Sequence, residues 1–376
     1  MRGWMKWSLF VLPAMIWTAG FTGTGWAYDI NEKLSVGGVM AGACQYRSVD
    51  HDDPDFESTG RGGAAFQPEV SFRPTDGDEV FVKLGLGAGN ALKPTDPEKP
   101  SFALSPWAAD LEDDVKDING RNRDYLLTVW YKHTFRFSED HALGITGGII
   151  DATDYVDENA HANDEFTQFM NEALVNAPNG FAPSYDAGGA VEWELGSFSA
   201  KGVAMGVGEN DDGISYHYYA AQLGYHPKTG LGEGNYRVVF ATTSKDFLDT
   251  LQENKEAQKA IIVSLDQELG DVFGAWVRFG WGKDDAVVVW KNLHSGGIDV
   301  KGKGWGREKD NIGIGYARLS KGNQDIDRSH AFEAYYRCVF NEFLAATADV
   351  QYMADRYHEG DDRKGWVFGV RLSVEF

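Results

Sequence analysis

Ten polar and aromatic residues in the C-terminal half of this 376-residue chain lie in runs that alternate apolar and polar side chains. Within each run they would share one face, because successive residues of a β-strand point to opposite sides. They are Arg237, Trp276, Arg278, Glu333, Tyr335, Arg337, Asp349, Gln351, Arg371 and Glu375. Arginine and carboxylate groups match vicinal hydroxyl groups, while indole and phenol rings offer flat stacking surfaces. This chemistry suits weak, reversible binding of a hydroxylated solute.

Each of these side chains also has a simpler interpretation, as a member of a salt-bridge or hydrogen-bond ladder that stiffens a wall. Catalytic motifs are missing: the chain has no nucleophile motif, phosphate loop or HExxH helix. The paired Asp113 and Asp114 lack the defined separation across a cleft that a glycosidase needs. The acidic runs 209–212 and 359–362 lack the fixed ligand offsets of a calcium loop. We therefore expect no catalytic residue, metal site or cofactor.

The strands that must position these side chains are clearest at the end of the chain, where residues 364–376 alternate with strict period two. The same period recurs over residues 125–137 and 273–281, and sixteen such segments follow one another along the chain. If the apolar face of each strand meets lipid, the ten residues named above face the inside of a barrel. The sequence thus predicts an all-β fold, a transmembrane antiparallel β-barrel of about 16 strands.

The links between the expected strands favour a barrel over a β-sandwich, because short and long links alternate. Short links such as 138–140 fall at one end of the strands, and long ones such as 90–123 and 151–183 fall at the other. The alternation fails between residues 283 and 310, where an expected strand at 286–293 follows a short link and precedes a long one. The strand count is open at that place.

Two of the long loops have an amphipathic pattern, and we expect helices at Asp164 to Val175 and, more weakly, at Lys245 to Ala257. A loop folded against the inner wall would bury the apolar face of the first helix and narrow the pore. The residues before that helix form the candidate constriction, and they are Asp151, Asp154, Asp157 and Asn159. The alternative for this cluster is a solvated acidic loop capped by a helix.

Residues 1–27 have the three regions of a secretory signal peptide: a basic start, a short apolar stretch and a small-x-small site before Tyr28. Residues 28–376 contain no linker or repeat and are expected to form one barrel domain. A mean hydropathy of -0.38 is compatible with a membrane barrel, because its inner side chains are polar. These features predict export to the outer membrane of a Gram-negative bacterium.

The formal net charge of -22 makes nucleic acid an unsuitable partner, because phosphate binding requires clustered Lys and Arg. Cys44 and Cys338 are the two cysteines, and they fall in expected strands that are not neighbours, so we expect no structural disulfide. Outer-membrane lipid and lipopolysaccharide are the expected surroundings of the barrel.

Several motifs resemble those of the carbohydrate-selective porins, the OprB-like family. They include the runs Asp113 to Arg121, Leu126 to His133, Gly147 to Asp151 and Asp349 to Tyr352, in this order and spacing. The resemblance implies a sixteen-stranded porin that passes sugars by passive diffusion and does not act as an enzyme. A C-terminal Phe376 also resembles the signal by which the barrel-assembly machinery recognises its substrates.

Two other functions are compatible with the residues. The acidic charge would suit a general or cation-preferring diffusion porin, because a ring of lumen carboxylates selects cations. A secreted β-protein that binds glycans without crossing a membrane would show the same alternation of apolar and polar residues in its strands.

Overall fold

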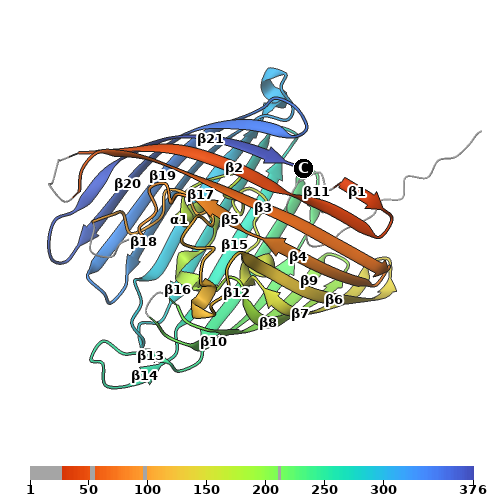
Figure 1. Cartoon of the computed structure of the whole chain (residues 1–376), viewed down its shortest axis with the longest axis horizontal. Helices are drawn as coiled ribbons and strands as arrows, with labels where there is room; N and C mark the ends of the chain where they lie inside the picture. The colour runs from red at the N-terminus through yellow and green to blue at the C-terminus, as the bar shows by residue number, and fades with distance from the viewer. Residues whose placement is uncertain (1–27, 51–55, 96–99, 211–212) are drawn as a thin grey trace, which may run out of the picture.

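The computed structural model describes residues 28–50, 56–95, 100–210 and 213–376 of the chain. They form a closed antiparallel β-barrel of sixteen strands (Figure 1). The barrel strands are β2 (Leu34–Val49), β3 (Thr59–Thr75), β4 (Asp78–Leu84) continued by β5 (Leu86–Ala88), β6 (Leu126–Ser138), β7 (His141–Ile150), β8 (Asp186–Leu195), β9 (Phe198–Val207), β10 (Tyr216–Tyr225), β12 (Gly232–Thr243), β15 (Lys259–Leu269), β16 (Phe273–Gly282), β17 (Trp290–Lys301), β18 (Asn311–Lys321), β19 (Ile326–Val339), β20 (Leu344–Tyr357) and β21 (Arg363–Glu375).

Each barrel strand pairs with the next one in the chain, and β21 pairs with β2 to close the cylinder. The remaining elements are short: β1 (Tyr28–Asn31), β11 (Lys228–Thr229), β13 (Phe247–Leu248), β14 (Lys255–Glu256), α1 (Glu172–Val175), and the 3-10 helices η1 (Ile118–Gly120), η2 (Ala152–Asp154), η3 (Pro178–Gly180) and η4 (Gly302–Trp305). No helix in the described part of the chain is long and apolar enough to cross a membrane.

The two faces of the barrel wall differ as the alternation predicts. On β21 the side chains of Phe368, Val370 and Leu372 are exposed on the outer face, whereas Arg371 is fully buried on the inner face. The same alternation of exposed and buried positions runs through β10, β15 and β18. The expected transmembrane barrel is therefore confirmed. Cys44 on β2 and Cys338 on β19 are both free thiols.

The two ends of the barrel carry different connections. The end with short links, which also holds Phe376, is called the turn end here, and the end with long links is called the loop end. The expected strand at 286–293 was misplaced, because β17 spans Trp290–Lys301. With this correction residues 283–289 join strands at the loop end and residues 302–310 join them at the turn end, so the links alternate between the two ends, although the link 302–310 is not short.

The expected helices are largely absent. Between Asp164 and Val175 only Glu172–Val175 is helical, and Lys245 to Ala257 contains the two-stranded hairpin β13–β14. In the first segment, side chains of the barrel wall bind backbone groups that a helix would use internally, as described below. In the second, Phe247 packs on Tyr216 with ring centroids 5.0 Å apart. The hairpin buries this one aromatic side chain without forming a helical face.

Candidate functional site: the lumen of the barrel

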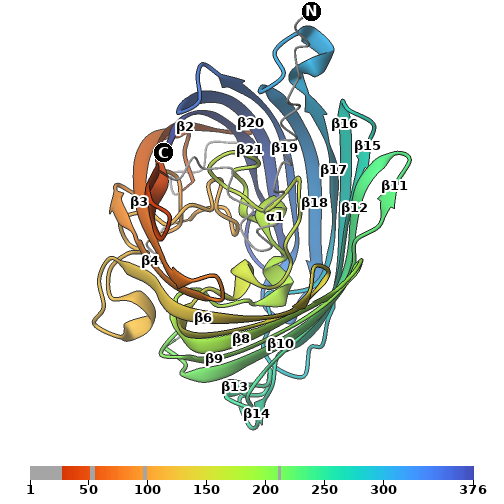
Figure 2. The same ribbon diagram turned by 90° about the vertical axis from the view of Figure 1, so that its right-hand side faces the viewer.

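Two loop-end segments enter the barrel, residues 100–125 and 151–185, and α1 of the second lies inside the ring of strands (Figure 2). We call them the inner segments. They are joined to each other by backbone hydrogen bonds from Ala108 N to Met170 O, at 2.8 Å, and from Glu172 N to Ser105 O, at 3.1 Å. The expectation of a loop folded against the inner wall thus describes the course of the chain, although its helix is only one turn long.

Arg278 of β16 is the most heavily engaged side chain of this contact. It is fully buried, and its Nε donates to Asp157 Oδ1 at 2.7 Å. Its other nitrogens donate to the carbonyl oxygens of Leu174, Val175 and Ala162. A buried guanidinium is stable only when its donors are matched in this way. Arg278 therefore fixes three stretches of the second inner segment to one strand of the wall.

Three further wall residues bind backbone or amide groups of the inner segments. Glu333 of β19 accepts hydrogen bonds from the backbone N–H groups of Met170 and Asn171, at 2.6 and 2.8 Å. Arg371 of β21 donates to the carbonyl oxygens of Glu165 and Gln168. Gln351 of β20 accepts from Asn171 Nδ2 at 2.9 Å and donates to Pro106 O at 2.8 Å. These bonds occupy the groups that a helix at Asp164 to Val175 would have paired internally.

The aromatic residues of the same wall also contact the second inner segment. The ring of Phe169 meets Trp276 of β16 and Tyr335 of β19 edge to face, with centroids 5.6 and 5.1 Å away. Gly315 of β18 makes room for this ring, since a Cβ atom there would lie 2.9 Å from Phe169. The flat faces that the sequence offered for stacking are thus occupied by a side chain of the protein itself.

The other predicted lumen residues pair within the wall. Arg237 donates to Asp266 at 2.7 Å, and Arg337 forms an ion pair with Glu375. Asp349 accepts from Gln351 Nε2 at 2.9 Å. All ten predicted residues lie inside the barrel, where the structure places them behind or beside the inner segments.

Within the predicted constriction, Asp151 accepts from Thr153 N at 2.8 Å and forms the N-cap of η2. Asp157 is held by Arg278, and Asn159 donates to Ser264 Oγ at 3.3 Å. Only Asp154 among these four residues is exposed. The cluster is therefore mainly part of the contact between the second inner segment and the wall.

The inner wall opposite these contacts carries a ladder of charged side chains, most of them partly exposed, that the sequence did not single out. Lys83 of β4 pairs with Glu69 of β3 at 2.9 Å. Lys132 of β6 pairs with Glu192 of β8 at 2.5 Å. Lys201 of β9 lies 2.7 Å from Glu158 of the second inner segment and 3.5 Å from Glu192. We call these six residues the charged ladder; the same strand parity applied to β4, β6 and β9 would have found its lysines.

Acidic side chains of the inner segments border the space in front of the charged ladder, and they are Asp110, Asp154 and Glu165. Enclosure within the barrel, and then the neighbouring Asp114 carboxylate, raise the pKa of Asp110 to about 6. Enclosure, and then nearby carboxylates, also raise the pKa of Asp154 and Glu165. Lys83 is close enough to interact electrostatically with Asp154 and Glu165. One lysine of the wall thus faces several carboxyl groups of the inner segments.

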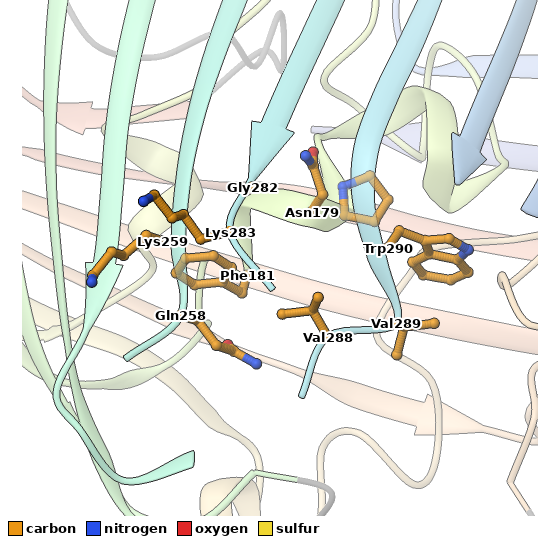
Figure 3. Close-up of a pocket in the computed structure, with 10 residues that line it drawn as sticks. Asn179, Phe181, Gln258, Lys259, Gly282, Lys283, Val288, Val289 and Trp290 are labelled. Atoms are coloured by element: carbon orange, nitrogen blue, oxygen red, sulfur yellow. The ribbon is translucent and has the colours of Figure 1, made fainter. Parts of the chain in front are cut away.

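A separate pocket of about 150 Å³ lies at the loop end, between η3 and the ends of β15, β16 and β17 (Figure 3). Its lining is largely apolar and includes Phe181, Val288 and Trp290. The ammonium ends of Lys259 and Lys283 point away from Trp290 in the close-up. This pocket is a packing gap behind the second inner segment and lies apart from the charged ladder.

A closed sixteen-stranded barrel with charged groups on its inner wall and chain segments folded into its lumen is the architecture of a porin. Comparison with known proteins agrees. The carbohydrate-selective porin family, OprB, matches residues 108–376. An uncharacterised protein of Aquifex aeolicus (strain VF5) is 32% identical over 319 residues, which cover 84% of this chain and 90% of that one.

The chain therefore belongs to the carbohydrate-selective porin family, whose members are channels for passive diffusion. Solved structures show the same fold at low sequence identity. The high-pH structure of Pseudomonas putida OprB has a TM-score of 0.73 at 15% identity and covers 92% of this chain and 94% of that chain. The outer membrane channel DcaP of Acinetobacter baumannii has a TM-score of 0.57 at 10% identity and covers 94% and 99%.

Proposed function

We propose that sugars pass through this porin between the charged ladder and the acidic edge of the inner segments. The observation that supports this route is the unequal use of the inner wall. The strands from β15 to β21 are covered by the inner segments, whereas Lys83, Glu69 and Lys132 on the opposite strands keep partly exposed side chains. Those of the ten predicted lumen residues that bind the inner segments lie behind these segments and hold them in place beside the route.

The charged ladder suits hydroxyl groups because its members are already paired. A paired lysine and carboxylate can each offer a further hydrogen bond to a passing hydroxyl without leaving an unpaired charge. Such contacts are weak, and conduction needs sites that bind a solute well enough to admit it and weakly enough to release it.

Single-channel conductance in planar bilayers tests this proposal. Glucose or maltose should reduce the ion current of the wild-type channel, and Lys83→Met should weaken that reduction about threefold by removing one hydrogen-bonding partner. Lys33→Met is the matched control, because Lys33 is an exposed lysine at the turn end. An ion current that neither sugar reduces would contradict the proposal.

A preference for cations is a second candidate property, and Asp110, Asp154 and Glu165 favour it. Three carboxyl groups beside one lysine would raise the local concentration of cations when they are ionised. Reversal potentials in a salt gradient measure this directly. A sugar channel with a mixed lumen would show a potential near zero, whereas a cation-preferring one would show a potential of the sign expected for cations.

We also propose that the barrel is exported by the signal peptide at 1–27, which lies outside the described residues, and resides in the outer membrane. In that placement the turn end is periplasmic and the loop end is extracellular. Barrel homologues of the family are outer-membrane proteins, which supports this assignment. Recovery of the protein from the soluble periplasm after fractionation on a sucrose gradient would contradict it and favour a secreted glycan-binding protein.

Recognition of Phe376 by the barrel-assembly machinery belongs to the same proposal. Phe376 continues β21 by exchanging backbone hydrogen bonds with Gly38, at 2.9 and 3.1 Å, next to the seam between β21 and β2. Deleting Phe376 should lower the amount of folded barrel in the membrane severalfold and leave the conductance of the barrels that do form unchanged. Normal assembly of this truncated chain would argue against the role.

A further inference from the structure

The outer surface of β18 to β21 carries a group of cations near the loop end. It consists of Arg318, Arg328, Arg356 and Lys364, which we call the cationic rim. Arg318, Arg356 and Lys364 are exposed, and Arg328 is partly exposed. They share the outward parity of Tyr316, Phe332, Tyr352 and Trp366, so they point toward the surroundings of the barrel and not into its lumen.

Strand register places this group directly beside a row of aromatic rings. Tyr316, Phe332, Tyr352 and Trp366 are partners across four adjacent strands. Two residues closer to the loop end, the next row reads Arg318, His330, Ala354 and Lys364. Aromatic rings mark the level at which the apolar core of a membrane meets its headgroups. The cations therefore lie at headgroup height.

Arg328 and Arg356 stand directly opposite each other one row further out. Like charges in this position destabilise a sheet unless an anion lies between them. Asp327 supplies only part of that charge, since it lies 3.9 Å from Arg328 and 3.8 Å from Arg356. Among the described residues Arg318 and Lys364 have no carboxylate within ion-pair distance. Within the described chain, the four cations of the cationic rim therefore outnumber the nearby carboxylates Asp327 and Asp50, and Asp50 is hydrogen-bonded to Tyr352 of the aromatic row.

The other half of the barrel has no such feature. At the same level the outward row across β7 to β10 reads Ile149, Ala187, Gly206 and His217. In β6 to β10 and β12 of the described chain, every Lys and Arg lies on an inward position. Among the described barrel strands, the lipid-facing cations of the loop end therefore cluster on β18 to β21, and Lys259 on β15 lies apart from them.

We infer that the cationic rim binds the phosphate groups of lipopolysaccharide, the glycolipid of the outer leaflet. This inference rests on the proposed placement of the barrel in the outer membrane. Guanidinium groups match phosphate oxygens with two parallel hydrogen bonds, and an ammonium group adds a point charge. The aromatic row beneath would lie against the sugar and acyl boundary of the same lipid. A firmly bound lipid would then cover one sector of the barrel.

Binding of lipid A to the purified full-length barrel in phosphatidylcholine nanodiscs tests the inference. The triple variant R318Q/R356Q/K364Q should bind bisphosphorylated lipid A about 100-fold more weakly, since each cation near an anionic surface contributes roughly fivefold. The control K33Q/K228Q/K303Q removes the same charge from exposed lysines at the turn end and should bind like the wild type. Dephosphorylated lipid A should bind the wild-type barrel and the triple variant equally weakly.

Several results would overturn the inference. They are unchanged binding by the triple variant, equal binding of dephosphorylated lipid A by the wild type, and a rim that instead joins two copies of the chain in nanodiscs without lipid A. The heat-dependent mobility shift of a folded barrel verifies that the triple variant is intact. Sugar flux measured on the same samples separates this inference from the proposed function, because neither result depends on the other.

Discussion

The two halves of the inner wall use their polar residues differently. Along β15 to β21 several inward polar side chains are buried and bind the inner segments, as Arg278 and Glu333 do. Along β3 to β9 several charged inward side chains pair across the wall and stay partly exposed, as Lys83 and Glu69 do. The same strand parity therefore leads to two roles, one in holding the inner segments and one in lining the remaining space.

Burial explains why Arg278 must be so fully bonded. A guanidinium such as Arg278 with one missing partner would retain an uncompensated charge, at a cost of several kcal/mol. Lys83 and Lys132 can rely on water for their remaining donors, so a single carboxylate partner is enough. Wall residues that fix the inner segments should accordingly affect stability and pore size, and those of the charged ladder should affect selectivity.

Replacing Arg278 should have the largest effect. Arg278→Met removes the partner of the buried Asp157 and four hydrogen bonds to the second inner segment, at a cost of about 3–5 kcal/mol in the free energy of unfolding. Release of that segment should also raise single-channel conductance. Arg136→Met, at an exposed position near the turn end of β6, is the control. If Arg278→Met had the conductance and the stability of the wild type, the distinction between the two halves of the wall would not hold.

Phe169→Ala should have a similar but smaller effect on the same half. The truncation leaves a cavity between Trp276 and Tyr335 and should lower the free energy of unfolding by about 3 kcal/mol. Because the hydrogen bonds of Glu333 and Arg371 remain, conductance should change much less than in Arg278→Met. Urea titration and conductance on the same preparation would measure both quantities. A conductance change as large as that of Arg278→Met would show that packing, and not the arginine, holds the segment.

Substitutions on the opposite half should change selectivity without changing stability much. Lys83→Met removes the lysine that faces Asp154 and should raise the cation-to-anion permeability ratio about twofold, while Asp154→Asn should lower it by a similar factor. Reversal potentials in a KCl gradient provide the measurement. An unchanged permeability ratio in both variants would mean that neither side chain reaches the route of the ions.

The pH dependence should be the smallest effect. The pKa of Asp110 is raised to about 6, so this group is ionised above that pH and neutral below it. Any preference for cations should therefore be largest near pH 8 and fall as the pH is lowered through about 6. Asp110→Asn should flatten part of this change. A preference that grows on acidification would contradict the assignment of lumen carboxyl groups.

Much of the fold could be predicted from the sequence because the period of two is strict. It assigned Arg371 and Glu375 to the inside, and the alternation of turns and loops indicated a closed barrel. The strand at β17 was misplaced because the run Ala286 to Val289 is more β-like than the glycines of the true strand. Gly297 is required there, since a Cβ atom would lie 2.7 Å from Trp276 Nε1.

The lumen could be predicted only in part. Parity tells which side chains point inward, but it does not tell which of them a distant segment will cover. The helix expected at Asp164 to Val175 illustrates this limit, since Glu333 and Arg371, far along the chain, bind its backbone groups. Lys83 is partly exposed and lies on β4, outside the C-terminal strands that carry the ten predicted lumen residues.

Liposome swelling with a graded series of sugars tests the central claim most directly. Liposomes that contain the wild-type barrel should swell in glucose and more slowly in maltose, and should admit a neutral non-sugar solute of matched size less readily than either. Arg278→Met should reduce the difference between sugar and matched solute. No swelling in any sugar, or equal rates for sugars and matched solutes, would contradict the account of a carbohydrate-selective lumen.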